Sequence, residues 1–426
     1  MIMQITINSK QLYGELDKLA SFTDAPPPAV TRVVFSKVDL AARAYIRELC
    51  RAADLIVRED AVGNLFARWV GSEPSLAAIG TGSHTDAIPF AGAYDGTVGV
   101  LGGLEAIRAL QRAGFQPRRS IELLMFTSEE PTRFGIGCLG SRLLSGSLQA
   151  GRAKTLTDKE GQSLDQVRTA AGFTGTLDDV VLPEGYYEAF LELHVEQGPV
   201  LEARNIPVGV VTAIAAPASL RIWLDGEGGH AGTVLMPQRH DAFLAASEIS
   251  LAVESVVKST GAIDTVGTVG VCDVFPGAVN SIPSRVKIEI DVRDIDGARR
   301  DAVLRAIDEA CGRVTERRGV KLKKEVLNAD PPAHSGRRAL NALNQSCERC
   351  GISPFPLPSR AYHDSLFMSR ITEVGMLFVR CREGVSHRPD EYASADDVAT
   401  GTRVLADALA QLSLESQASI DFAGPD

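Results

Sequence analysis

The sequence predicts an α/β protein with a larger α/β domain, in which a mixed sheet lies between helices, and a small inserted α+β domain. Its 426 residues exceed the usual size of a single hydrophobic core, so two domains are expected. Apolar runs of strand length alternate with helical stretches, and their continuous apolarity is typical of strands covered on both faces. A middle segment has a β-α-β-β-α-β order of its own, which folds into one sheet with two helices on a single face.

The elements of the larger domain follow from the spacing of their apolar residues. Apolar positions that recur with the helical period predict amphipathic helices, whereas short uninterrupted apolar runs predict buried strands. The buried strands are expected at 77–83, 120–126, 188–194 and 375–379, and the helices at 39–55, 98–110, 363–370 and 394–412.

The small domain is expected between residues 213 and 327, and its order of elements is that of a ferredoxin-like fold. Its strands are expected at 220–224, 265–271, 287–292 and 320–326, and its helices at 241–257 and 298–317. Residues 1–212 and 328–426 would then form the two parts of the larger domain, with Asp330-Pro331-Pro332 marking the return of the chain.

The composition limits the partners and the compartment. Lys and Arg total 44 against 54 Asp and Glu, and the formal charge of -10 argues against nucleic acid or an anionic membrane as a partner. No apolar run reaches the length of a bilayer span, and the first residues do not have the pattern of a signal peptide. Seven cysteines, an odd number, favour reduced thiols in a cytoplasm over a disulfide framework. For the lone Cys347-Glu348-Arg349-Cys350 motif, two cysteines on a helix are favoured over a zinc ribbon or a redox pair.

Residue types that bind divalent metals stand near the ends of the expected strands. They are His84, Asp95, Glu129-Glu130, His194 and His387. Taken singly, such a histidine is usually a polar cap or a core residue, and such an acidic pair is usually a solvated loop. Together, at strand ends where open α/β sheets bind ligands, they favour a hydrolytic centre of two divalent ions. Donors that are all N or O fit Mn²⁺, Zn²⁺, Co²⁺ or Ni²⁺. A metal-binding imidazole usually gives its other ring N–H to a carboxylate or a carbonyl, and Asp86 is a candidate to accept that N–H of His84.

Seven sequence blocks, in order between about residues 80 and 400, carry a resemblance to a known family. They are His84-Thr85-Asp86, Tyr94-Asp95-Gly96, Glu129-Glu130 with Arg133-Phe134, His194-Val195-Glu196-Gln197-Gly198-Pro199, Gly229-His230-Ala231-Gly232, Asn280-Ser281-Ile282-Pro283 and Gly384-Val385-Ser386-His387. In these blocks the chain resembles the hydantoinase/carbamoylase amidases, which belong to the aminoacylase-like superfamily of dinuclear metallohydrolases.

The resemblance implies a metal centre in the larger domain, which would be the catalytic domain. The implied ligands are His84, Asp95 and His194 for one ion, and Asp95, Glu130 and His387 for the other. Two divalent ions, Mn²⁺ most of all, would activate water, and Glu129 would act as the general base because a base must not be tied to a metal. A cis peptide bond is also expected after the bridging aspartate, between Asp95 and Gly96.

The same resemblance implies how the substrate is bound. Arg293 and Asn280 would bind a carboxylate, Gln197 would bind the ureido amide, and His230 would stabilise the oxyanion. For Arg293, a surface charge beside Asp291 is an equally reasonable interpretation. The small domain would serve as a dimerisation and lid domain, with some of its residues reaching the active site of the partner subunit in a homodimer.

One block narrows the substrate among the ureido acids that this family hydrolyses. Carbamoylases typically have Ser-Gly-Ala-Gly-His-Asp-Ala, whereas this chain has Ser359-Arg360-Ala361-Tyr362-His363-Asp364-Ser365, which resembles the ureidoglycolate amidohydrolases. Tyr362 would hydrogen-bond the 2-hydroxyl of the substrate, or it would only pack beneath the metal loop. His363 is expected to touch the site. The alternatives are an N-carbamoyl-L-amino acid, N-carbamoyl-β-alanine or allantoate hydrolase, and a binding protein that has kept the fold without the chemistry.

Overall fold

The computed structural model describes residues 4–415. The chain folds into two compact units. The large unit contains the chain up to Thr212, His334–Leu357, and the chain from His363 onward. The small unit contains Ala213–Ala333 and Pro358–Tyr362. We propose, as the sequence predicts, that residues 213–327 form an inserted domain.

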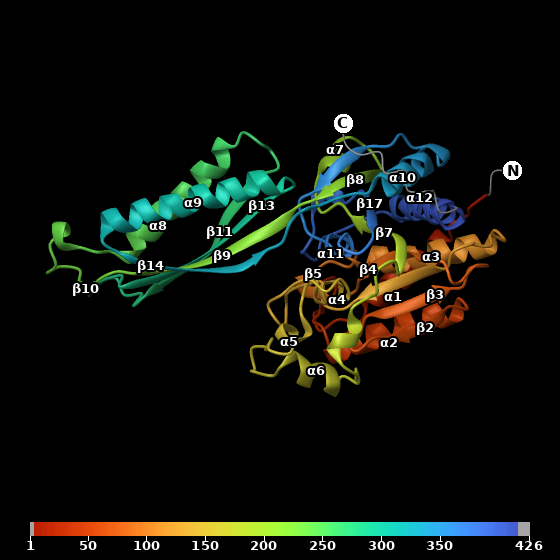
Figure 1. The fold of residues 1–426 in the computed structure, drawn as a ribbon, viewed down its shortest axis with the longest axis horizontal. Helices are drawn as coiled ribbons and strands as arrows, with labels where there is room; N and C mark the ends of the chain where they lie inside the picture. Colours follow the sequence, from red (N-terminus) through yellow and green to blue (C-terminus); the bar gives the residue numbers. More distant parts are fainter. Residues whose placement is uncertain (1–3, 416–426) are drawn as a thin grey trace. The chain divides into compact units, whose positions relative to one another are not determined.

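The large unit is built on a mixed sheet (Figure 1). Four strands at its centre run parallel, and antiparallel strands extend it on both sides. In spatial order the strands are β15 (Ala333–His334), β8 (Val208–Ile214), β17 (Glu373–Val379), β7 (Tyr187–Val195), β4 (Ala78–His84), β6 (Ile121–Phe126), β3 (Leu65–Trp69) and β2 (Ile56–Glu59), and β16 (Pro356–Ser359) also pairs with β8. The central strands β4 and β6 are buried at every position, as expected for strands covered on both faces.

Helices cover the sheet and enclose two apolar clusters. One cluster packs the strands against α1 (Ser9–Ala20), α2 (Lys37–Ala52), α3 (Thr97–Arg112), α10 (Arg337–Arg349) and α12 (Ala395–Leu414). The other packs them against the shorter helices α4 (Leu139–Leu144), α5 (Ala150–Ala153), α6 (Leu164–Ala170) and α11 (Asp364–Met368). Each element expected in the larger domain is therefore present. No helix among residues 4–415 is long and apolar enough to cross a membrane.

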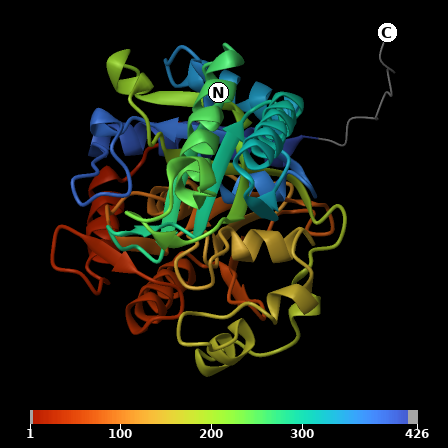
Figure 2. The same cartoon turned by 90° about the vertical axis from the view of Figure 1, so that its left-hand side faces the viewer.

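The small unit is a four-stranded antiparallel sheet in the order β11-β13-β9-β14. These strands are β9 (Ala216–Asp225), β11 (Val266–Phe275), β13 (Arg285–Asp294) and β14 (Lys321–Ala329). The helices α8 (Ala242–Ser259) and α9 (Gly297–Arg318) lie together on one side of this sheet (Figures 1 and 2) and share its apolar core. The order and the one-sided helices are those of a ferredoxin-like fold, so the predicted fold class is confirmed.

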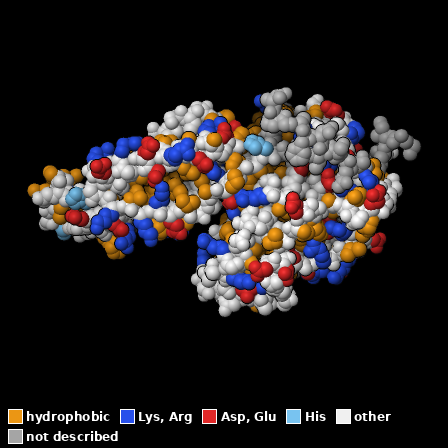
Figure 3. Space-filling view, in the orientation of Figure 1, with side chains coloured by type: hydrophobic (Ala, Val, Ile, Leu, Met, Phe, Trp, Pro, Cys, Tyr) orange, Lys and Arg blue, Asp and Glu red, His pale blue; other side chains and the backbone are white. Residues whose placement is uncertain are grey.

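Charged side chains of both signs are interspersed on the face drawn in Figure 3. No extended patch of Lys and Arg gathers on that face, as a nucleic-acid surface would require. All seven cysteines of the chain are free thiols. Cys347 and Cys350 lie at the end of α10 without forming a disulfide, which fits two cysteines on a helix.

Candidate metal centre

The candidate metal ligands meet at the carboxyl ends of the central parallel strands. His84 is the last residue of β4, and His194 lies near the end of β7. Asp95 lies in the turn that leads into α3. Gly96 makes this turn with a φ of +66°, and a Cβ there would lie 2.5 Å from the His84 ring. The expected cis bond after Asp95 was wrong: the cis bonds of the described chain precede prolines, and the left-handed glycine provides the reversal instead.

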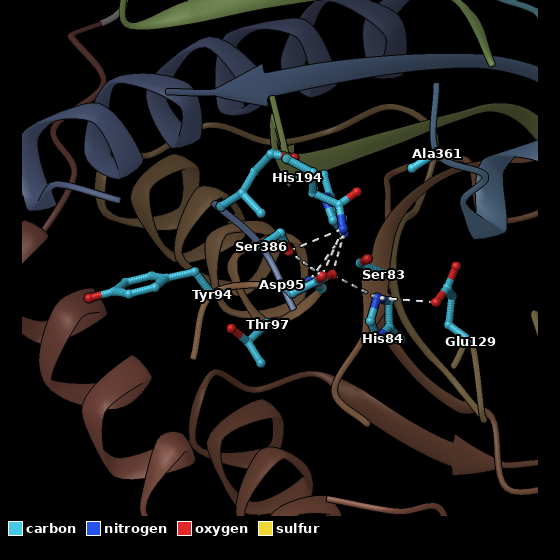
Figure 4. Close-up of polar contacts among 12 residues, drawn as sticks. Ser83, His84, Tyr94, Asp95, Thr97, Glu129, His194, Ala361 and Ser386 are labelled. Carbon is cyan, nitrogen blue, oxygen red and sulfur yellow. Dashed lines mark hydrogen bonds and ion pairs between the residues drawn. The ribbon is translucent and has the colours of Figure 1, made fainter. Parts of the chain in front are cut away.

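Asp95 stands at the centre of the site (Figure 4). Its Oδ1 lies 3.5 Å from Nε2 of His84 and 3.2 Å from Nε2 of His194. Its Oδ2 lies 3.2 Å from Nε2 of His387, whose Nε2 is 3.3 Å from Oε1 of Glu130. The structure thus assembles two donor groups, His84/Asp95/His194 and Asp95/Glu130/His387, that share one carboxylate. This arrangement suits two neighbouring ions bridged by Asp95.

The electrostatics of the cluster fit divalent cations. Burial alone would lower the pKa of His84, but the negative charges of Glu129, Asp95 and Asp86 raise it well above 6.5. Burial would raise the pKa of Asp95, but hydrogen bonds with three histidines hold it well below 3.8. Hydrogen bonds to Asp95 and Glu130 raise the pKa of His387 to about 11. The carboxylates thus attract positive charge to this point, and the donors are all N or O, which suits Mn²⁺, Zn²⁺ or similar ions.

Glu129 is buried beside the two donor groups but belongs to neither. Its Oε2 lies 3.7 Å from Nε2 of His84, and Figure 4 shows it on the side of His84 away from Asp95. Burial raises the pKa of the Glu129 carboxyl well above 4.5, although the charge of His84 opposes this. A carboxyl group with a raised pKa that is not a ligand is suited to accept and return a proton.

Asp86 orients the His84 ring, as expected, and it has a second role as well. His84 Nδ1 lies 3.1 Å from the backbone carbonyl oxygen of Asp86, so a carbonyl rather than the carboxylate orients the ring. The Asp86 carboxylate instead accepts hydrogen bonds from the backbone N–H groups of Glu129, at 3.2 Å, and of Glu130, at 3.1 Å. It thereby holds the two adjacent glutamates in place.

Three residues of the site adopt left-handed backbone conformations that non-glycine residues rarely take. They are Cys138, Gln197 and His387, with φ of +54°, +54° and +58°. Gln197 Nε2 donates to Oδ2 of Asp95 at 2.8 Å, while its Oε1 is buried with no hydrogen-bond partner. The Cys138 thiol donates to Oε1 of Glu129 at 3.4 Å. Strain of this kind concentrates at functional sites, where the surrounding structure holds it.

His363 packs against a ligand. Its ring centroid lies 4.5 Å from that of His194, edge to face, and burial lowers its pKa well below 6.5. Glu192, His194 and His363 also lie close enough to form a third donor group. Both Glu192 oxygens, however, already accept hydrogen bonds, one from Ser83 at 2.7 Å and the other from Ser365. That group is therefore better explained as a scaffold for His194.

The remaining candidate residues belong to the small unit and form two separate pairs. His230, in β10 (Gly229–His230), pairs with Ser281 of β12 (Ser281–Ile282), and the N–H of Ala231 donates to the carbonyl oxygen of Asn280 at 2.9 Å. Arg293 lies in β13, with its guanidinium 5.9 Å from the centre of the Tyr362 ring. Its Nε donates to Asp291 at 2.7 Å, so one of its five N–H groups is engaged there.

Two residues of the centre, Ser386 and Glu391, were not predicted. Ser386 Oγ lies 2.8 Å from Oδ2 of Asp95 and 2.7 Å from Oε2 of Glu391. Burial, together with the charge of Asp95, raises the pKa of Glu391 to about 7. Glu391 follows His387 by four residues, and that proximity is the one sequence signal that could have indicated it.

Comparison with known proteins gives a family match, two similar enzymes and two similar crystal structures. The chain matches Peptidase family M20/M25/M40 over residues 80–411. It is 51% identical over 418 residues to the ureidoglycolate hydrolase of Arabidopsis thaliana, covering 96% of this chain and 88% of that protein. It is 37% identical over 403 residues to the N-carbamoyl-L-amino-acid amidohydrolase of Pseudomonas sp. (strain NS671), covering 94% and 97%. Crystal structures of AtUAH with glyoxylate and with (S)-hydroxyglycine each match with a TM-score of 0.88 and 50% identity, covering 96% of this chain and 99% of that chain.

Proposed function

The chain belongs to Peptidase family M20/M25/M40, and from that membership and the geometry of the site we propose that it hydrolyses the carbamoyl C–N bond of ureidoglycolate. The observation that carries the hydrolytic part is the pair of donor groups sharing Asp95, with Glu129 beside them. The substrate rests on the 51% identity to a ureidoglycolate hydrolase over 96% of the chain. The resemblance to the carbamoylase-type amidases is confirmed by the same relatives.

The residues have the following roles in this reaction. The two donor groups that share Asp95 would hold two divalent ions, Mn²⁺ being our proposal, and these would supply Lewis acidity for activating water and polarising the carbamoyl oxygen. Glu129 takes a proton from the attacking water and returns it to the nitrogen that leaves the carbamoyl carbon. The carbamate half breaks down to ammonia and carbon dioxide, and the other half is hydroxyglycine, which loses ammonia to give glyoxylate. Crystal structures of AtUAH contain glyoxylate and (S)-hydroxyglycine.

Two side chains offer the hydrogen-bonding groups that a ureido acid needs. Gln197 has a buried Oε1 without a partner, which is an acceptor for a ureido N–H. His230 Nδ1 accepts from the N–H of Gly232 at 3.0 Å, so its Nε2 carries the proton in the neutral ring. An N–H donor of that kind can stabilise the oxyanion. We propose that Arg293 and Asn280 bind the substrate carboxylate. The buried His363 would support His194 by packing against its ring.

We propose that a homodimer completes the active site. His230 and Arg293 lie near opposite ends of β13. His230 belongs to the two-stranded sheet β10-β12, whose strand β12 closely precedes Arg285 at the start of β13, and Arg293 lies eight residues further along that strand. Eight residues of strand span about 26 Å, so both side chains cannot contact one small substrate. The Arg293 guanidinium lies beside the Tyr362 ring, and Tyr362 directly precedes His363, which packs against the candidate ligand His194. We therefore assign Arg293 to the active site of its own subunit and His230 to the active site of the partner subunit.

Exposed apolar residues of the small unit support a second copy as the partner. The side chains of Phe243, Leu244 and Leu251 are exposed along α8. The strand β11 lies at the edge of its sheet, and Val266 and Phe275 at its two ends are exposed as well. An apolar helix stripe beside an open strand edge suits association with an identical surface. With seven free thiols, we place this dimer in the cytoplasm.

A panel of ureido acids tests the substrate. The purified protein, reconstituted with Mn²⁺, is assayed for ammonia release from ureidoglycolate, allantoate, N-carbamoyl-β-alanine and N-carbamoyl-L-amino acids. We expect the highest kcat/KM with ureidoglycolate. Equal or better turnover of the N-carbamoyl amino acids would favour the second candidate function, which the 37% identity to a carbamoyl amino acid hydrolase suggests.

Glu129→Gln tests the proposed general base. The variant keeps the size of the side chain but cannot accept a proton, so kcat should fall by about 10²–10⁴-fold. Elemental analysis should still find two metal ions per subunit, because Glu129 belongs to neither donor group. Turnover at the wild-type rate would refute the assignment, and a wild-type protein that binds no metal after reconstitution would point to a binding protein instead.

A further inference from the structure

Glu391 links the two segments that carry Asp95 and His387. One carboxylate oxygen, Oε1, accepts hydrogen bonds from the backbone N–H groups of Tyr94, at 2.7 Å, and of Asp95, at 3.0 Å. The other oxygen, Oε2, lies 2.7 Å from Oγ of Ser386, the residue before His387. The two segments are almost 300 residues apart in sequence, so Glu391 joins them at the point where the second donor group is assembled.

Glu391 is buried, and the absence of a side chain at Gly92 leaves room for it. The residue is 4% exposed, and a Cβ on Gly92 would lie 2.3 Å from the Cβ of Glu391. Only a glycine at position 92 lets the glutamate approach so closely. Within residues 4–415 no cation forms an ion pair with Glu391, so its contacts are the hydrogen bonds to the two ligand-bearing segments.

The second donor group depends on this link more than the first. His84 and His194 extend from buried central strands, whereas the side chain of His387 is 47% exposed on a loop. Gln197, just beyond β7, offers one link between the two segments, because its Nε2 lies 2.8 Å from Oδ2 of Asp95 and 3.3 Å from Oγ of Ser386. Ser386 reaches Asp95 directly at 2.8 Å and is itself held by Glu391. Mutation of a residue that hydrogen-bonds a metal ligand, without binding the metal itself, commonly changes metal affinity by about 10–100-fold.

We propose that Glu391 is a positioning residue that aligns Asp95 with His387 and thereby sets the affinity of the second metal ion, bound by Asp95, Glu130 and His387. The inference rests on the metal centre of the proposed function. It goes beyond that function in assigning the affinity of the second ion to a side chain that binds neither ion.

Three variants test this role by metal binding. Glu391→Ala removes all three hydrogen bonds, so the second Mn²⁺ should bind at least about tenfold more weakly while the first binds as in the wild type. Glu391→Gln keeps an oxygen for the two backbone N–H groups and a polar group for Ser386, so it should bind within about threefold of the wild type. Asp390→Ala is the matched control, because the Asp390 side chain is 49% exposed and pairs with Arg388.

Mn²⁺ binding is measured by calorimetric titration of the metal-free proteins and by elemental analysis after dialysis against graded chelator. Equal weakening of both ions, with a lower melting temperature of the metal-free protein, would show a merely structural residue and overturn the proposal. Two ions bound normally by Glu391→Ala would overturn it as well, and so would a Glu391→Gln variant as weak as Glu391→Ala. A wild-type protein that binds fewer than two ions would instead contradict the proposed metal centre itself.

Discussion

At the scale of single residues, the division of labour between Glu129 and Glu130 depends on what surrounds each carboxylate. Asp86 fixes both backbone N–H groups, so the two side chains leave the same short segment in different directions. Glu130 reaches His387, whereas Glu129 lies beside His84 with the Cys138 thiol as a donor. The sequence predicted the two glutamates as a pair. It could not predict Cys138, because a buried cysteine has no motif that distinguishes a hydrogen-bond donor from a core residue.

Tyr362 provides a prediction about substrate choice. Tyr362→Phe keeps the ring near Arg293 but removes the hydroxyl. If that hydroxyl binds the 2-hydroxyl of ureidoglycolate, kcat/KM for ureidoglycolate should fall by about 10–100-fold, the cost of an unpaired polar group. N-carbamoylglycine, which lacks the 2-hydroxyl, should be hydrolysed as by the wild type. An equal loss with both substrates would show that the tyrosine acts through packing.

At the scale of elements, the long and buried helices and strands could be predicted from the sequence, whereas several of the short ones could not. The strands β4, β6 and β7 and the helix α12 were predicted because long buried segments carry either a run of mainly apolar and small residues or a periodic apolar pattern. The region that holds α4, α5 and α6 was not predicted, since these helices have four to seven residues and are too short to show a period. The link through Glu391 was equally hidden, because its partners are distant in sequence.

The turn at the start of α3 gives a prediction at this scale. Gly96→Ala should destabilise the protein by about 1–2 kcal/mol through its left-handed φ. It should also weaken metal binding, because the new Cβ would lie 2.5 Å from the His84 ring. Gly114→Ala is the matched control, with a φ of +70° and nothing within 4 Å of the added Cβ. Urea unfolding should show a larger loss for Gly96→Ala, because its Cβ also crowds the buried His84 ring, and elemental analysis should show a loss of metal for Gly96→Ala alone. Normal metal content in Gly96→Ala would contradict the argument.

At the scale of the whole molecule, the small unit determines whether one chain is sufficient for catalysis. The sequence predicted its ferredoxin-like order from two strand–helix–strand patterns. It could not place His230 and Arg293 near opposite ends of β13, because only the pairing of β10 with β12 and the extent of β13 give their separation. That separation makes the assignment of residues to subunits testable with mixed dimers.

Mixing two inactive variants tests whether the site is shared between subunits. In a mixed dimer of Glu129→Gln and His230→Ala, one metal centre has an intact Glu129 and receives His230 from the partner, so it should be active. Random exchange of subunits gives half mixed dimers with one competent site each, hence about a quarter of the wild-type activity. Glu129→Gln mixed with Arg293→Ala should stay inactive, because we assign Arg293 and Glu129 to the same subunit. Subunits are exchanged by mild denaturation and refolding, and ammonia release is measured. Activity in the second mixture but not in the first would reverse the assignment, and none in either would place both side chains in the site of their own chain.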